Sequence, residues 1–83
     1  MSMEQLKGQV VRALAGHDAG KLFWVAETEG DFLLLADGKS RRLSRLKRKR
    51  RKHVELIGLT ADVAGDGQLR RALAASRDLG SRR

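Results

Sequence analysis

The sequence contains no cysteine, so neither a disulfide nor a thiolate metal site can form, and this composition fits a reducing compartment. Aromatic residues are also scarce, with one tryptophan, two phenylalanines and no tyrosine. So few rings exclude stacking on single-stranded bases as the main way of binding a ligand.

Long apolar runs are missing as well, and none approaches the roughly 20 residues that a membrane span requires. The N-terminal residues MSMEQLKGQVV lack a basic region followed by an apolar core, so we expect no signal peptide. The only histidines, His17 and His53, lie far apart in the sequence and suggest no catalytic or metal-binding constellation. We therefore predict a soluble, cytoplasmic protein that is not an enzyme, needs no cofactor and does not bind membranes.

Positive charge is what the sequence has in excess, and most of it lies in one segment. Residues 39–52 contain ten lysines and arginines and no acid, whereas the preceding 38 residues have a net charge of −3. The formal net charge of the 83-residue chain is +8, and its length suits one small domain. A one-signed concentration of this kind is typical of a protein that binds a polyanion. Nucleic acid is the first candidate partner, ahead of an anionic membrane surface.

The first half of the chain has the pattern of short strands separated by turns. Residues 9–15, 22–29 and 32–36 are apolar, β-branched or aromatic runs, which favour strands. Glycine and aspartate occupy the segments between them, and Asp37–Gly38 is a strong hairpin signal.

The second half predicts a closing strand and a helix. A short apolar patch around Val54 predicts the strand, and the helical spacing of Leu69 and Leu73 predicts a helix over 67–78. Asp66 is the expected N-cap, and 58–65 is the expected connector. The predicted division is a barrel over 1–58, followed by the connector and an amphipathic helix of the same domain over 59–83. The fold class is thus mainly β, a small barrel of four to five strands with a C-terminal helix.

Residues 8–27, GQVVRALAGHDAGKLFWVAE, resemble the KOW motif, in which a glycine opens an apolar strand, a glycine-bounded polar turn follows, and a second apolar strand closes the unit. The resemblance implies part of an SH3-like barrel whose first loop contacts RNA. The matching positions are Gly8, Val10, Val11, Gly16, Asp18, Gly20, Lys21 and Val25.

Three later segments, LADGKSRRL, KRKRRKHV and QLRRAL, look like the order found in short bacterial KOW-domain proteins. Those proteins are similar to large-subunit ribosomal proteins of archaea and eukaryotes, so the resemblance implies RNA, most of all ribosomal RNA, as the partner. The basic run over 47–52 is unbroken here, unlike the pattern expected of the family, and its conformation stays open.

The candidate RNA-binding residues combine the first loop with the basic run. Each can also be explained without RNA. The glycine turn can be a hairpin without a ligand, His17 can be an ordinary exposed residue, and the basic run can be a solvated face. The candidates are His17, Lys21, Lys39, Arg41, Arg42, Arg45, Lys47, Arg48, Lys49, Arg50, Arg51, Lys52 and His53. The glycines expected to shape turns are Gly16, Gly20 and Gly38.

The sequence thus predicts a monomeric RNA-binding module that grips structured RNA mainly through phosphates, in a ribosome-associated or assembly role. Three alternatives remain open: a transcription-linked KOW factor that binds nascent RNA or polymerase, an SH3-like adaptor that binds a peptide, and a nonspecific DNA binder. Competition between RNA and DNA duplexes for the protein would distinguish the nonspecific DNA binder from an RNA binder.

Overall fold

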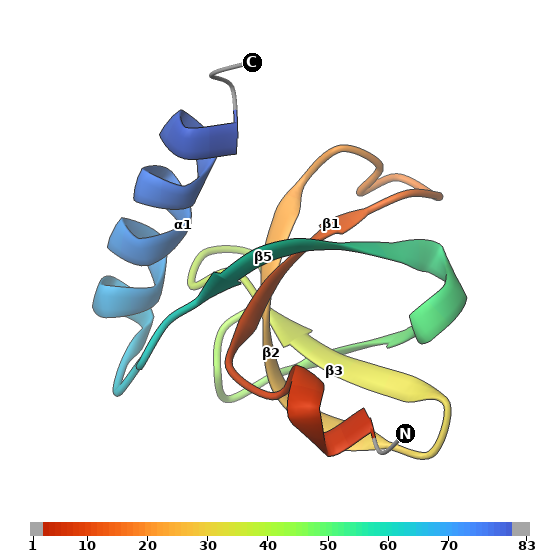
Figure 1. Ribbon diagram of the computed structural model, residues 1–83. Coiled ribbons are helices and arrows are strands. Elements are labelled where there is room, and N and C mark those ends of the chain that lie inside the picture. Colours follow the sequence, from red (N-terminus) through yellow and green to blue (C-terminus); the bar gives the residue numbers. More distant parts are fainter. Residues whose placement is uncertain (1–2, 81–83) are drawn as a thin grey trace.

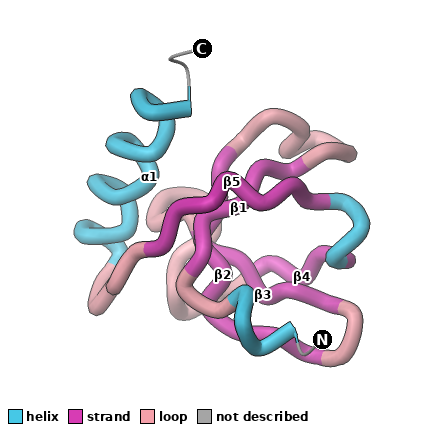
Figure 2. Tube along the Cα trace, in the orientation of Figure 1, coloured by secondary structure: helices cyan, strands magenta, loops and turns pink. Residues whose placement is uncertain are grey.

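The computed structural model describes residues 3–80 of the chain, and five strands and one long helix account for most of them (Figures 1 and 2). Two short 3₁₀ turns, η1 and η2, complete the secondary structure. In chain order the elements are η1 (Met3–Leu6), β1 (Gln9–Ala13), β2 (Leu22–Glu29), β3 (Phe32–Ala36), β4 (Lys47–Arg50), η2 (Arg51–His53), β5 (Val54–Thr60) and α1 (Asp66–Gly80).

The strands form one antiparallel sheet in the order β4-β3-β2-β1-β5. The two edge strands, β4 and β5, follow each other in the chain and are separated only by η2. The sheet therefore curls until its edges approach each other, as Figure 1 shows. The predicted fold class, a mainly β, small barrel-like domain with a C-terminal helix, is confirmed, although the barrel is not fully closed.

The predicted strands over 22–29 and 32–36 agree with β2 and β3, but the first strand ends two residues earlier than expected, at Ala13. The reason is that Leu14 leaves the sheet. Its N–H donates to the carbonyl of His53, and the residue is 51% exposed. The apolar residues 14 and 15 therefore belong to the loop.

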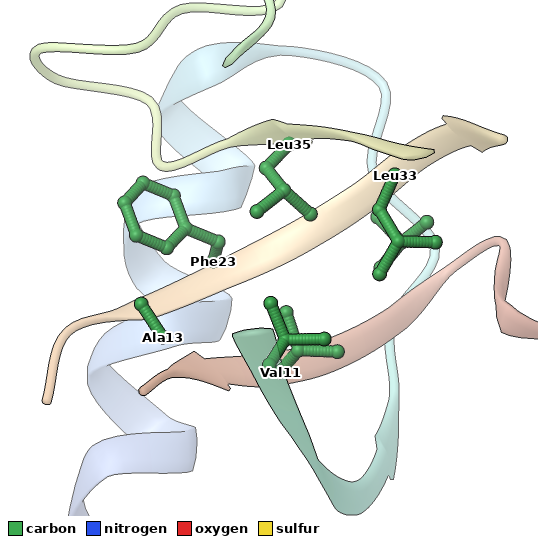
Figure 3. Packing of buried hydrophobic residues seen from close by; sticks show 7 residues of the cluster. Val11, Ala13, Phe23, Leu33 and Leu35 are labelled. Atoms are coloured by element: carbon green, nitrogen blue, oxygen red, sulfur yellow. The ribbon is translucent and has the colours of Figure 1, made fainter. Parts of the chain in front are cut away.

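Both faces of the sheet are covered, which explains the nearly continuous apolar runs. The interior of the barrel holds one cluster, shown in Figure 3, that consists of Val11, Ala13, Phe23, Val25, Leu33, Leu35 and Val54. On the outer face, Val10 and Ala36 pack against Leu69 and Leu73 of α1. Complete burial of a side chain such as Leu69 contributes about 1.5–3 kcal/mol, so the helix is an integral part of the packing.

The helix and the segment before it differ from prediction at three points. Residues 58–60 belong to β5 and not to a connector, because Gly58 adopts a φ of +84° and the strand continues past a register shift to pair Thr60 with Gln9. The helix extends beyond 67–78 at both ends, and Asp66 is its first residue and not the residue before it. The carboxylate of Asp66 accepts a hydrogen bond from the Leu43 N–H at 2.8 Å, which ties the β3–β4 loop to the helix.

The two adjacent aromatic residues of β2 both serve packing. Phe23 lies in the barrel interior, and Trp24 packs in the outer cluster beneath the helix. The indole N–H of Trp24 donates to the carbonyls of Gly8 and Ala61 at 3.1 and 3.0 Å. Phe23 is therefore not available as a stacking platform, and the half-buried ring of Trp24 is held in place by its packing and these two bonds. Over the described residues 3–80, no helix is long and apolar enough to span a membrane.

Candidate nucleic-acid interface

The basic run of residues 39–52 is divided among three elements that the barrel holds in place. Residues 39–46 lie in the β3–β4 loop, Lys47–Arg50 form the edge strand β4, and Arg51–His53 form η2. Backbone pairing with β3 makes 47–50 a strand, with Leu35 opposite Lys47 and Phe32 opposite Arg50. The conformation that the sequence left open is thus set by a long-range partner. Its dense charge also suits an edge strand, since charged side chains oppose edge-to-edge association.

Side chains of β4 alternate between two environments. Lys47 and Lys49 are half-buried and point toward the β1–β2 loop, whereas Arg48 and Arg50 are exposed. The Lys47 ammonium forms an ion pair with the Asp18 carboxylate, and Lys49 Nζ donates to the Ala15 carbonyl at 3.0 Å. These two lysines therefore fasten the β1–β2 loop to the edge strand.

The loop between β1 and β2 carries one half-buried charge interaction. The hydrogen bond from Lys47, together with nearby Lys21 and Lys49, holds the pKa of Asp18 below its usual range against the opposing effect of burial. The Lys21 ammonium lies 3.8 Å from the same carboxylate but is mostly exposed. Asp18 is thus neutralised locally by lysines. Its negative charge does not stand alone at the tip of the loop.

Arg48 and Arg50 share an aromatic support. Their guanidinium carbons lie 4.1 and 4.9 Å from the centre of the Phe32 ring, in cation–π geometry. Such contacts contribute about 0.5–1 kcal/mol at exposed sites and orient the guanidinium planes. Arg48 Nε also lies 3.5 Å from Glu29 Oε1, but both side chains are more than half exposed, so this pair is weak. Phe32 was not predicted as part of the site, because its register opposite Arg50 cannot be read from the sequence.

The loop between β3 and β4 is organised by one carboxylate. Asp37 Oδ1 accepts hydrogen bonds from the backbone N–H groups of Lys39 and Arg41, both at 2.8 Å, and Oδ2 accepts from the Ser40 hydroxyl at 3.0 Å. Burial raises the pKa of Asp37, but these hydrogen bonds outweigh it and leave the pKa below its ordinary value. Residues 39–42, which this turn contains or precedes, are exposed.

The predicted site residues fall into an exposed and a half-buried group. Arg51 and His53 belong to the second: Arg51 Nη1 donates to the Val54 carbonyl at 3.1 Å, and the His53 carbonyl accepts from Leu14. Lys47 and Lys49 belong there too. The exposed candidates are His17, Lys21, Lys39, Arg41, Arg42, Arg45, Arg48, Arg50 and Lys52.

The glycines expected to shape turns have different surroundings. Gly16, Gly20 and Gly38 all have positive φ, between +81° and +87°. Nothing lies within 4 Å of the position of a Cβ at Gly20, whereas at Gly38 the Asp66 carbonyl oxygen lies 2.6 Å away. Gly38 is therefore the point at which the β3–β4 loop meets the start of α1, and Arg70 Nη1 donates to its carbonyl at 2.7 Å.

A groove of about 820 Å³ runs between the β1–β2 turn, the β3–β4 loop and α1. Its positively charged side chains come from all three elements: Lys21, Lys39, Arg70, Arg71 and Arg77. The three helix arginines were not among the predicted site residues. Their position on the helix, largely off the apolar face, was a usable signal, but only the docking of α1 shows that they face the two basic loops.

Among residues 3–80, histidine, aspartate and glutamate side chains form no group of three that could hold a metal ion. Comparison with protein-family models finds no match, and neither does comparison with curated proteins. The fold and the charge distribution define a small basic β-barrel with a docked C-terminal helix. The KOW resemblance stays a prediction.

Proposed function

We propose that this chain is an RNA-binding module that grips structured RNA through phosphate contacts. The observation that carries the proposal is the acid-free basic run, seven of whose ten cations are exposed on a folded loop, edge strand and turn. Keeping so many like charges together is unfavourable unless an anion relieves their repulsion. These seven are Lys39, Arg41, Arg42, Arg45, Arg48, Arg50 and Lys52.

Arginine predominates among these exposed cations, and this favours phosphate and base-edge contacts over a loose counterion layer. Its planar guanidinium donates two parallel hydrogen bonds to a phosphate, which a lysine ammonium cannot do. Arg48 and Arg50 are the best oriented for such contacts, because the ring of Phe32 packs against both guanidinium groups. Lys47 and Lys49 instead hold the loop that would lie beside the RNA.

The KOW resemblance supports ribosomal RNA as the target and a structural or regulatory role, in ribosome association or assembly in the cytoplasm. Catalysis is not part of the proposal. Trp24 and Phe23 are both used in packing, which weighs against a peptide-binding adaptor with an aromatic groove.

Sedimentation of a lysate from the source cells through sucrose gradients, first in low and then in high salt, tests this role. We expect the protein to migrate with the large ribosomal subunit in low salt and to be released in high salt, since phosphate contacts are salt-sensitive. A protein that stays at the top of the gradient in low salt would rule out a stable ribosomal role. Competition between RNA and DNA duplexes of equal length would then separate a transcript binder from a DNA binder.

A further inference from the structure

The groove beside α1 is distinct from the surface of Arg48 and Arg50, neither of which lines it. One wall is the helix, with Arg71 and Arg77, and the opposite walls are the two loops that provide Lys21 and Lys39. Three segments far apart in the sequence thus direct cations into one depression.

Among the described residues, one of these cations has an acidic partner: the Lys21 ammonium lies 3.8 Å from the Asp18 carboxylate. Among the side chains that the structure describes, the only carboxylate that lines the groove is Asp37, and both of its oxygens already accept hydrogen bonds within the β3–β4 loop. Arg70 is anchored by its bond to the Gly38 carbonyl, so its charge is fixed at the edge of the groove. An anion that entered would meet these cations and would compete with a carboxylate at Lys21, whose contact with Asp18 is long.

We propose that this groove binds the sugar–phosphate backbone of a short single-stranded RNA segment, with Arg71 and Arg77 on one side and Lys21 and Lys39 on the other. This inference rests on the proposed function and adds a second contact, made by the C-terminal helix. A positively charged groove that follows the backbone is one of the two usual parts of a single-strand site, the other being aromatic side chains on which bases stack.

The size and lining of the groove decide between forms of RNA. A volume of about 820 Å³ lies within the range of small-ligand pockets, about 300–1,000 Å³, which suits a few nucleotides and not a duplex. The apolar part of its lining, Leu22, Leu73 and Ala74, can lie against ribose or base surfaces. None of the chain's three aromatic rings lines it, so we expect little preference for base identity.

The test uses the double variant Arg71→Gln/Arg77→Gln and a labelled single-stranded RNA of about 12 nucleotides, a length within the usual site sizes of about 4–16. Fluorescence anisotropy between about 50 and 200 mM KCl gives the slope of log affinity against log salt. Loss of two phosphate contacts should reduce this slope by about 1.4, at about 0.7 per contact on single strands. Both arginines are exposed, so the fold should be retained.

The matched control is Lys7→Gln/Arg12→Gln, which removes the same net charge from residues paired with Glu27 and Glu55 outside the groove. We expect its slope to stay close to that of the unmodified chain. If both double variants lower the slope equally, only overall charge matters and the groove is not a site. If the unmodified chain does not bind RNA at all, the proposed function fails and not merely the groove.

Crosslinking can locate the bound RNA directly. Because the chain has no cysteine of its own, a photoreactive group can be attached to a single introduced cysteine. A photoreactive group attached to the variant Ala74→Cys, in the groove, should crosslink to the bound RNA. The same group on Gln5→Cys, an exposed position outside the groove, should not. Equal crosslinking at both positions would overturn the inference. So would displacement of the RNA by polyglutamate at equal charge, which would indicate an acidic protein as the partner.

Discussion

Gly38 is the residue at which the β3–β4 loop and the C-terminal helix come closest. A Cβ there would lie 2.6 Å from the Asp66 carbonyl oxygen and 2.9 Å from Arg70 Cγ, and the backbone has a φ of +81°. We expect Gly38→Ala to destabilise the fold by about 2–5 kcal/mol, combining a left-handed backbone term of about 1–2 with an overpacking term of about 1–3. Urea unfolding measures this change.

Gly20→Ala is the matched control, since Gly20 has a similar φ of +87° but open space around the Cβ position. It should cost only the backbone term, about 1–2 kcal/mol. Equal destabilisation by the two variants would show that the contact between Gly38 and the helix is not tight.

Asp18 makes stability depend on acidity. Because its pKa is lower in the folded chain than the ordinary value of 3.8, the unfolded chain binds the proton more readily. The stabilisation by the Lys47 ion pair is therefore complete above that value and is lost as pH falls through the folded-state pKa. Asp18→Asn should lower stability by about 1.5–3 kcal/mol at neutral pH and make the melting temperature fall less steeply below about pH 4.

The control for this prediction is Asp62→Asn, because Asp62 is exposed and forms none of the ion pairs found among the described residues. Its melting curve should follow that of the unmodified chain from neutral to acid pH. An Asp18→Asn variant with unchanged acid sensitivity would mean that the loop is not fastened through this carboxylate.

At the scale of elements, β4 separates anchoring residues from residues that face solvent. Replacing the whole run from Arg48 to Arg51 would also remove the bonds of Lys49 and Arg51 to backbone carbonyls. Arg48→Gln/Arg50→Gln is the cleaner variant. It should reduce the salt slope by about 1.8 on duplex RNA, using the value of about 0.9 per contact known for duplex DNA, with little change in melting temperature. Anisotropy titrations measure the slope, and unaltered binding would exclude these arginines from the interface.

The docking of α1 is tested by one buried and one exposed leucine. Leu69 is fully buried between helix and sheet, so Leu69→Ala should destabilise by about 2–5 kcal/mol. Leu56 on β5 is 38% exposed, and the same truncation should have a much smaller effect in urea unfolding. A minor effect of Leu69→Ala would indicate that the helix is only loosely attached.

Local patterns were enough to predict β2, β3 and the existence of α1, since apolar runs between glycine turns and helical spacing are properties of short segments. They could not predict β4, whose four residues are all lysine or arginine and form a strand only because β3 pairs with them. For the same reason the supporting ring of Phe32 was missed. The arginines of α1 became part of a groove only through tertiary docking, which joins loops and helix from distant parts of the chain.

At the scale of the whole molecule, most of the basic residues are separate in sequence from the residues that form most of the barrel. The acidic and neutral first half forms most of the barrel, and the basic run borders its open edge. In the proposed function, the seven exposed cations of that run contact a folded RNA. The five around the groove, with Lys39 in both sets, contact an adjoining single strand.

The most direct test of RNA binding is the salt dependence of the unmodified chain's affinity for a structured RNA with a single-stranded flank. With five or six phosphate contacts at about 0.7–0.9 each, the slope of log affinity against log salt should lie between about −3.5 and −5.4. Anisotropy titrations from about 50 to 200 mM KCl measure it. No binding at the lowest salt, or an affinity that does not change with salt, would contradict the assignment of the basic run to a phosphate-binding surface.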